Sequence, residues 1–527
     1  MKIACVQQTA RDVKNYKVAW SDILSLIDNA AEKDADIILL PECSYPGYYL
    51  GYDIDKTNEA MEYIEEIIKD ISLKAIKHKT YIAIGIVLKK NNEFINGGLL
   101  FNPLGEIIMT CGKSNLWHFD HKWFNHGKAF SVVETEIGNL SMMVCADGRA
   151  PEIARILALK GADLILDMAN LTSSGSDPSK LTNPQYEYML PARALENGVW
   201  IAMADKVGLE ANSVLYSGKS CVINPEGDII ASASSDKEEI IYAEIDLAAT
   251  KKELPKRNPR AYKLLTLPTK DLPIYKDLTV TTNTKETEVY CAVAQFEYDS
   301  MEEYIAKAVH FTKTLEDLDC RIIMFPQLER EMDLMQCIQK ITSSLSDSKT
   351  IVALTGYCKE EQRKYKSTII TSKEMIFGIY DKIHNIEEGI EDGIEVNIID
   401  TPYCKIGVMH DQEGLIPEFT RCLMLGGADI VLWADNSIDT KPDIITRTRA
   451  AENKIYILRT SSKDKDDYAT ITSPEGRTIA STISGIDQST SALMVIPLCK
   501  SKTIVPGTNV VLDRIPALYN KLVKLEL

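Results

Sequence analysis

The sequence lacks the features that would place it in a membrane, on nucleic acid or in a disulfide scaffold. No stretch approaches the ~18 apolar residues of a membrane span, and the first residues, MKIACVQQTARDV, do not resemble a signal peptide. The formal net charge of −17 argues against binding to phosphate backbones, which needs a basic surface. The 12 cysteines contain no CxxC pair, which favours reduced thiols in a cytoplasmic protein over disulfides or a zinc site.

The length and composition indicate a globular protein with more than one core. At 527 residues the chain is too long for one core, so we expect two large domains of roughly 250 residues each. Strand and helix patterns alternate in the first half, with hairpins among them. This order predicts an α/β fold in which a sheet carries helices on one face and needs a second sheet on the other.

The stretch 141–151, SMMVCADGRAP, predicts a buried strand that ends at Cys145 and is followed by a helix. At such a turn the backbone N–H groups are free and the helix dipole favours an anion. Nucleophilic cysteines need this environment. The alternative is an inert thiol in the core, where free cysteines are common.

Two further charged residues lie at the ends of predicted apolar strands, where a hydrophobic core would not favour a charge. Glu42 ends the apolar strand IILLPE, and Lys113 follows another predicted strand. A carboxylate, an ammonium and a thiol at one rim of a sheet can serve as general base, oxyanion stabiliser and nucleophile. Taken singly, Glu42 could be a solvated strand end and Lys113 a surface lysine.

Residues 1 to about 250 resemble the nitrilase (carbon–nitrogen hydrolase) superfamily along their whole length. The resemblance rests on IILLPE, CGKSNLW, MMVCADGRAPEIARILALKGADLIL, PARALEN and INPEGDIIA, in that order. It implies a four-layer αββα sandwich and a catalytic Glu–Lys–Cys triad, here Glu42, Lys113 and Cys145. The family's second glutamate falls in HFDHKWFNHG, where the nearest acid is Asp120, one methylene shorter.

The roles that the resemblance implies give a mechanism without a metal or a cofactor. Glu42 takes the thiol proton, and Lys113 lowers the pKa of Cys145. The thiolate attacks a carbonyl or nitrile carbon, and the Lys113 ammonium and the Ala146 backbone N–H hold the oxyanion.

The loops after Glu42 and Lys113 are rich in aromatic and histidine residues. Aromatic residues on rim loops often line a small-molecule pocket, so Tyr49 is predicted to contact substrate. A cover on the core or a subunit contact are the alternatives. His118, His121 and His126 match no standard zinc spacing, and we interpret them as solvated loop residues.

The second half of the chain repeats the first. RIIMFPQLE echoes DIILLPECS, YDKIH echoes CGKSN, and TRAAEN echoes ARALEN. DQEGLIPEFTRCLMLGGADIVL, at 411–432, aligns without a gap on the stretch that begins at Cys145. The repeat predicts two tandem αββα copies: a catalytic domain at 1–250, a C-terminal arm and linker at 251–285, a second copy at 286–500 and a tail at 501–527.

The second copy does not keep the triad. Gln327 stands in the place of Glu42, Lys382 in that of Lys113 and Asp411 in that of Cys145. Glutamine is no base at neutral pH, so we predict a pseudoenzyme domain. Placing His410 on the nucleophile needs a one-residue gap and still supplies no thiol.

The superfamily resemblance implies dimers formed through helical layers, so we expect the second copy to act as an intrachain partner of the first, with further homo-oligomers possible. The residues Ala-Asp-Gly-Arg follow the nucleophile where nitrile-cleaving relatives tend to have Trp-Glu. This favours a small amide or carbamoyl substrate over a nitrile. A ligand-binding scaffold without catalysis is the alternative of another class. The second half has no glycine-rich phosphate loop for a nucleotide.

Overall fold

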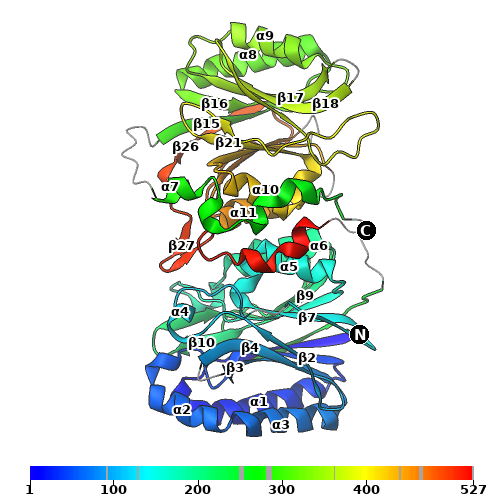
Figure 1. Ribbon diagram of the computed structural model, residues 1–527, viewed down its shortest axis with the longest axis vertical. Helices are drawn as coiled ribbons and strands as arrows, with labels where there is room; N and C mark the ends of the chain where they lie inside the picture. Colours follow the sequence, from blue (N-terminus) through cyan, green and yellow to red (C-terminus); the bar gives the residue numbers. More distant parts are fainter. Residues whose placement is uncertain are drawn as a thin grey trace. The chain divides into compact units, whose positions relative to one another are not determined.

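The computed structural model describes residues 1–90, 93–127, 130–248, 254–279, 288–360, 363–437, 441–461 and 467–524. The chain forms two compact units (Figure 1). The first comprises Met1–Leu254 and the short segment Val505–Thr508; the second comprises Pro255–Ile504 and Asn509–Leu527. Residues 255–279, which the sequence assigned to an arm and linker, therefore belong to the second unit.

The first unit contains two sheets. The larger has the order β11-β10-β1-β2-β3-β4-β5, with β14 paired to β1, and the smaller has the order β13-β12-β9-β8-β7-β6. The strands of the larger sheet are β1 (Lys2–Thr9), β2 (Ile37–Tyr45), β3 (Tyr81–Lys90), β4 (Glu93–Phe101), β5 (Ile107–Gly112), β10 (Lys206–Glu210), β11 (Val214–Ser217) and β14 (Glu239–Glu244). Those of the smaller are β6 (Val132–Thr135), β7 (Gly138–Val144), β8 (Leu164–Met168), β9 (Trp200–Ala204), β12 (Cys221–Ile223) and β13 (Ile229–Ser232).

Alternating side chains of the strands build separate layers on the two faces of the larger sheet. Ala4 and Val6 of β1 pack with residues of α1 (Tyr16–Ala31) and α3 (Ile64–His78), whereas Ile3 and Cys5 pack with residues of the smaller sheet. On the far side, α6 (Leu190–Asn197) contacts β9 and β12, and α5 (Pro151–Leu159) contacts β7. These layers confirm the predicted αββα sandwich (Figure 1).

The second unit repeats this plan. Its sheets have the orders β19-β18-β17-β16-β15-β26 and β20-β21-β22-β23-β24-β25. The strands are β15 (Glu288–Gln295), β16 (Cys320–Met324), β17 (Ile351–Glu360), β18 (Arg363–Thr371), β19 (Ile376–Asp381), β20 (Ile399–Asp400), β21 (Lys405–His410), β22 (Ile430–Asp435), β23 (Tyr456–Ser461), β24 (Thr470–Thr472), β25 (Thr478–Ser481) and β26 (Gln488–Val495). The helices are α8 (Met301–Asp317), α9 (Leu334–Ser343), α10 (Pro417–Leu425) and α11 (Pro442–Asn453).

The remaining elements are short. They are α2 (Ile54–Glu62), α4 (Asp120–Trp123), α7 (Tyr275–Thr279), α12 (Pro497–Lys500), β27 (Thr503–Val505) and β28 (Thr508–Asn509). Within the part of the chain that the structure describes, no helix has the length and apolar character needed to span a bilayer.

Candidate active site

Glu42 lies at an irregularity near the carboxyl end of β2. The pairing of β2 with β3 is interrupted between Leu40 and Tyr45, as in a β-bulge. Gly85 of β3 lies opposite, and a Cβ added there would come within 2.5 Å of the Glu42 Cα. Bulges change the direction in which a side chain points. This bulge and the close approach of Gly85 bring the Glu42 carboxylate into the interior, where it is fully buried.

The Lys113 ammonium, just after β5, lies between two carboxylates. Its Nζ is 2.8 Å from Glu42 Oε1 and 2.7 Å from Asp120 Oδ2, and all three side chains are buried. Burial disfavours the charged form, but the nearby negative charges, that of Asp120 first, outweigh it and hold the pKa of Lys113 well above its usual value. The shorter Asp120 therefore reaches the lysine.

The two oxygens of the Glu42 carboxylate differ in their hydrogen bonds to the described residues. Its Oε1 accepts hydrogen bonds from Lys113 Nζ and Asn96 Nδ2. No hydrogen-bond partner of Oε2 exists among the described residues, although this oxygen is buried. A buried carboxylate oxygen without a donor is suited to accept a proton from a neighbouring thiol or from water.

Cys145 begins a single 3-10 turn, Cys145–Arg149, directly after β7. Its φ of 50° lies in the left-handed region, which a residue with a side chain rarely adopts unless the surroundings impose it. The Cys145 N–H donates to Asp167 Oδ1 at 2.9 Å, and its carbonyl accepts from Gln185 Nε2 at 2.8 Å. Two buried polar side chains thus hold the strained turn that presents the sulfur.

The surroundings of Cys145 favour the protonated thiol over the thiolate. Burial raises its pKa well above the usual value, and the Glu42 charge raises it further. Lys113 and the backbone N–H of Asn170 lower the pKa, but the net shift is upward. Lys113 thus acts in the predicted direction without producing a low-pKa thiol, and a base is needed to form the thiolate.

Asp147 connects the turn after β7 with the loop after Lys113. Its Oδ1 accepts from the N–H groups of Ser114 and Asn115 at 3.0 and 2.8 Å, and its Oδ2 accepts from Val144 N–H at 3.2 Å. Burial raises the pKa of Asp147 to about 7, although these N–H donors act in the opposite direction. One side chain therefore fixes the distance between the two elements.

Tyr49 belongs to an aromatic cluster on the loop after Glu42. Its ring centroid is 4.5 Å from that of Trp123, in an edge-on arrangement. Glu210 anchors the same loop, because its Oε1 accepts from the N–H groups of Tyr48 and Tyr49 at 2.7 and 2.8 Å. The contact of Tyr49 with substrate stays a prediction.

The three loop histidines make separate contacts. His126 Nδ1 is 2.8 Å from the Ser114 carbonyl, and His118 N–H donates to Oγ1 of Thr508, in the C-terminal segment of the first unit. The His121 and His126 rings are 6.2 Å apart. In the described ranges, no group of three or more His, Cys, Asp or Glu could hold a metal ion.

The second unit carries a different set of side chains at the corresponding place. Asp411 begins a 3-10 turn after β21 with a φ of 45°, as Cys145 does after β7, so Asp411 and not His410 occupies the nucleophile position. Asp411 Oδ2 is 2.5 Å from Lys382 Nζ and 2.6 Å from Lys366 Nζ. Lys366 is the fourth residue of β18, as Asn96 is of β4.

The two ammonium groups dominate this second cluster. Burial acts to raise the pKa of Asp411, but Lys366 and Lys382 outweigh it and lower the pKa to about 2. Gln327, which stands in the place of Glu42 in the sequence repeat, is also buried. The cluster is thus a buried ion network. It has no thiol in the place of Cys145 and no carboxylate in the place of Glu42.

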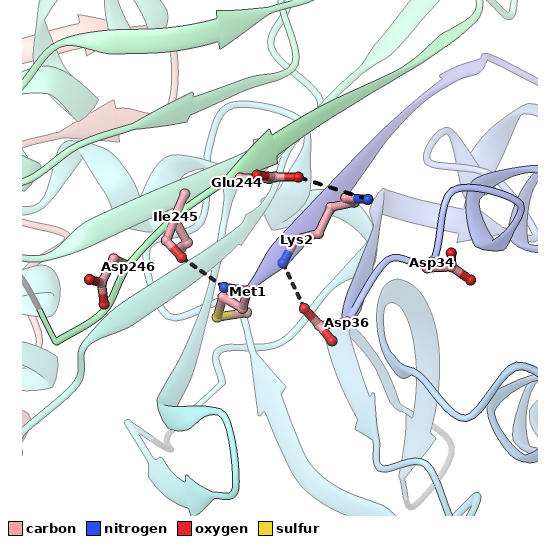
Figure 2. Close-up of a pocket in the computed structure, with 7 residues that line it drawn as sticks. All are labelled: Met1, Lys2, Asp34, Asp36, Glu244, Ile245 and Asp246. Carbon is pink, nitrogen blue, oxygen red and sulfur yellow. Dashed lines mark hydrogen bonds and ion pairs between the residues drawn. The ribbon is translucent and has the colours of Figure 1, made fainter.

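An open cavity of the first unit lies away from these residues. Met1, Lys2, Asp36 and Glu244 are among the residues that line it (Figure 2). Because β1 and β2 are parallel and begin at this cavity, it lies at their amino ends, whereas Glu42 lies at the carboxyl end of β2. Lys2 pairs with Glu244 and Asp36 accepts from the Lys2 N–H, so these charges already have partners.

The αββα layers and the match to a known family together define the class of protein, an enzyme that hydrolyses C–N bonds. The family model described as carbon-nitrogen hydrolase matches residues 2–252 and 300–492. The chain belongs to the carbon–nitrogen hydrolase family and contains two tandem copies of its domain.

Known proteins of this family are similar to the chain. A protein named nitrilase from Pyrococcus abyssi is 31% identical over 47% of this chain and 90% of its own length. A protein named omega-amidase from Xenopus laevis is 28% identical over 50% of this chain and 97% of its own length. A crystal structure of an amidase from Nesterenkonia sp. has 23% identity and a TM-score of 0.42, covering 48% of this chain and 93% of that one.

Sequence reasoning missed several buried polar residues in the clusters of the two units. Asn96, Asp147, Asp167 and Lys366 were not among the predicted site residues. Asp167 interrupts the apolar strand LILDM and Asn96 interrupts the stretch FINGGLLF, and these interruptions were a usable signal. A polar residue in a buried strand needs a partner, and here the partners are Glu42 and the Cys145 N–H.

Proposed function

We propose that this protein hydrolyses the C–N bond of a small amide or carbamoyl compound through an acyl-enzyme on Cys145. The observation that carries the proposal is the buried Lys113 ammonium held between Glu42 and Asp120, with its charge felt by the Cys145 thiol. A fixed cation beside a protonated thiol and a free carboxylate oxygen supplies a nucleophile, a base and an oxyanion stabiliser together.

In the acylation step, Glu42 Oε2 takes the thiol proton and the sulfur bonds to the carbonyl carbon. The carbonyl electron pair moves to oxygen, where the Lys113 ammonium and the Ala146 N–H stabilise it. When the tetrahedral intermediate collapses, the C–N bond breaks and Glu42 returns the proton to the departing nitrogen. Water, deprotonated by Glu42, then attacks the thioester and releases the acid and the thiol.

The choice of amide over nitrile rests on the sequence after the nucleophile and on the relatives. Ala-Asp-Gly-Arg follows Cys145, and several relatives are named omega-amidase. The relative from Pyrococcus abyssi is named nitrilase, so nitrile hydrolysis is the second candidate. We place the protein in a reducing compartment such as the cytoplasm, because its 12 cysteines are free.

The decisive experiment is mass spectrometry of the intact protein after incubation with small amides, carbamoyl compounds and nitriles. We expect a covalent adduct with amides or carbamoyl compounds, absent in Cys145→Ala. An adduct with nitriles alone favours the second candidate. A compound that binds without adduct or turnover in the wild type would instead support the non-catalytic scaffold.

We also propose that the second copy is a pseudoenzyme that serves as an intrachain partner of the first. Asp411 supplies a carboxylate where catalysis needs a thiol, and the charge of this carboxylate is neutralised by Lys366 and Lys382. All turnover should therefore vanish in Cys145→Ala, and residual turnover in that variant would contradict this assignment. Full activity of a soluble 1–285 fragment would refute the partner role.

A further inference from the structure

Asn170, which follows β8, carries a buried amide that has no hydrogen-bond partner among the described residues. Its side chain is 5% exposed, and neither Oδ1 nor Nδ2 finds a hydrogen-bond partner in the residues that the structure describes. Most buried side-chain amides are bonded, because an unsatisfied buried donor or acceptor costs free energy. The mechanism above does not use this side chain.

Three backbone contacts place Asn170 beside the active-site cluster. Its own N–H lies close enough to the Cys145 sulfur to lower the pKa of that thiol. The carbonyl of the preceding residue, Ala169, accepts from the Glu42 N–H at 3.4 Å, and the N–H of the following residue, Leu171, donates to Asp205 Oδ1 at 2.9 Å. Asn170 thus lies where the carboxyl ends of β2, β7, β8 and β9 meet.

The second copy repeats this backbone arrangement. Asn436 stands at the corresponding position after β22, and its N–H donates to Asp411 Oδ1 at 3.1 Å. In both copies the asparagine backbone faces the residue at the nucleophile position. The side chain of Asn170 is therefore carried by a fixed backbone next to the reacting sulfur.

We propose that Asn170 contacts the substrate and selects compounds with an N–H group on the scissile nitrogen, its Oδ1 accepting that N–H. This inference rests on the proposed function. A primary carboxamide carries one acceptor and two donors. Lys113 and the Ala146 N–H serve the carbonyl oxygen, so the two N–H donors need acceptors. Glu42 Oε2 and Asn170 Oδ1 are buried acceptors without a protein donor in the described chain.

The contact distinguishes amides and carbamoyl compounds from esters, whose leaving oxygen carries no N–H. Losing it should slow amide cleavage and leave ester cleavage with the same acyl group almost unchanged. A side chain that only supports the fold would slow both reactions alike. The ratio of amide to ester kcat/KM is therefore the informative quantity.

The test compares wild type and Asn170→Leu on propionamide and methyl propionate, or on the pair whose acyl chain forms the Cys145 adduct fastest. We expect kcat/KM for the amide to fall about 10- to 100-fold and that for the ester to stay within about threefold. Because the amide has no protein partner to lose, the melting temperature should stay level or rise. Asp167→Asn is the matched control: it alters another buried group beside Cys145 and should change both substrates equally.

An equal fall on both substrates, or no fall on the amide, would overturn the role of Asn170. If Asn170→Leu does not fold, the inference is also overturned unless Asn170→Ala shows the selective loss of amide cleavage. Failure of the proposed function is seen separately, because the wild type would then form no adduct on Cys145.

Discussion

The sharpest prediction concerns Glu42→Gln, which should impair catalysis while making the thiol more acidic. Glutamine has nearly the same shape but cannot take a proton at neutral pH. Because burial raises the pKa of the Cys145 thiol, a base is needed to form the thiolate, and losing it should lower kcat/KM by about 10²- to 10⁴-fold. The assay is steady-state hydrolysis of the best amide from the adduct screen.

The effect on the thiol has the opposite sign. The negative charge of Glu42 raises the pKa of Cys145, whereas Lys113 lowers it. Removing the carboxylate therefore lowers the thiol pKa from its raised value. Ultraviolet absorbance of the thiolate, measured against pH with Cys145→Ala as the blank, should show a midpoint at lower pH in Glu42→Gln than in the wild type.

The fold should tolerate this substitution. Lys113 keeps Asp120 at 2.7 Å, and the new amide oxygen can still accept from the ammonium. Replacing a charged hydrogen-bond acceptor by a neutral one should lower the free energy of unfolding by about 1–3 kcal/mol. Turnover within about threefold of wild type, or a thiolate midpoint shifted to higher pH, would refute the assignment of Glu42 as base.

Three further predictions concern the supports of the two clusters. Asp147→Asn should lower the free energy of unfolding by about 1–3 kcal/mol in chemical denaturation and also reduce turnover, because an amide cannot accept all three N–H bonds. Gly85→Ala should reduce kcat/KM by more than about tenfold, because the added methyl group would come within 2.5 Å of the Glu42 backbone and displace the carboxylate. Unchanged kinetics would contradict the role of the bulge. Asp411→Asn should destabilise the second unit by about 3–5 kcal/mol, because two buried ammonium groups lose their shared carboxylate, yet leave adduct formation on Cys145 intact. The folded-state pKa of Asp411, about 2, lies below its usual 3.8, so in the wild type this stabilisation is complete above about pH 4 and is lost as the pH falls toward 2, which acid denaturation would show.

The fold could be predicted from the sequence because its signals are local. Short apolar runs such as IILLP and YIAIGIVL mark strands, and the repeat of 145–166 at 411–432 marks the second copy. Glu42, Lys113 and Cys145 each follow an apolar strand, and in a layered sheet strand ends gather at shared edges. The position of each residue at a strand end therefore predicted that the three side chains lie near one another.

Contacts between distant residues could not be read from the sequence. The bulge at Glu42 depends on Gly85 in the next strand, and the reach of Asp120 to Lys113 depends on the loop that carries it. The unpartnered amide of Asn170 is visible only when every neighbour is in place.

The sequence by itself thus determined the layered fold, its duplication and the loss of a thiol and a base in the second copy, because periodicity and residue type suffice for these. The tertiary structure alone decided the direction in which the pKa of Cys145 is shifted and the ion network at Asp411. Both depend on burial and on charges a few ångströms away, and these are properties of the packed chain.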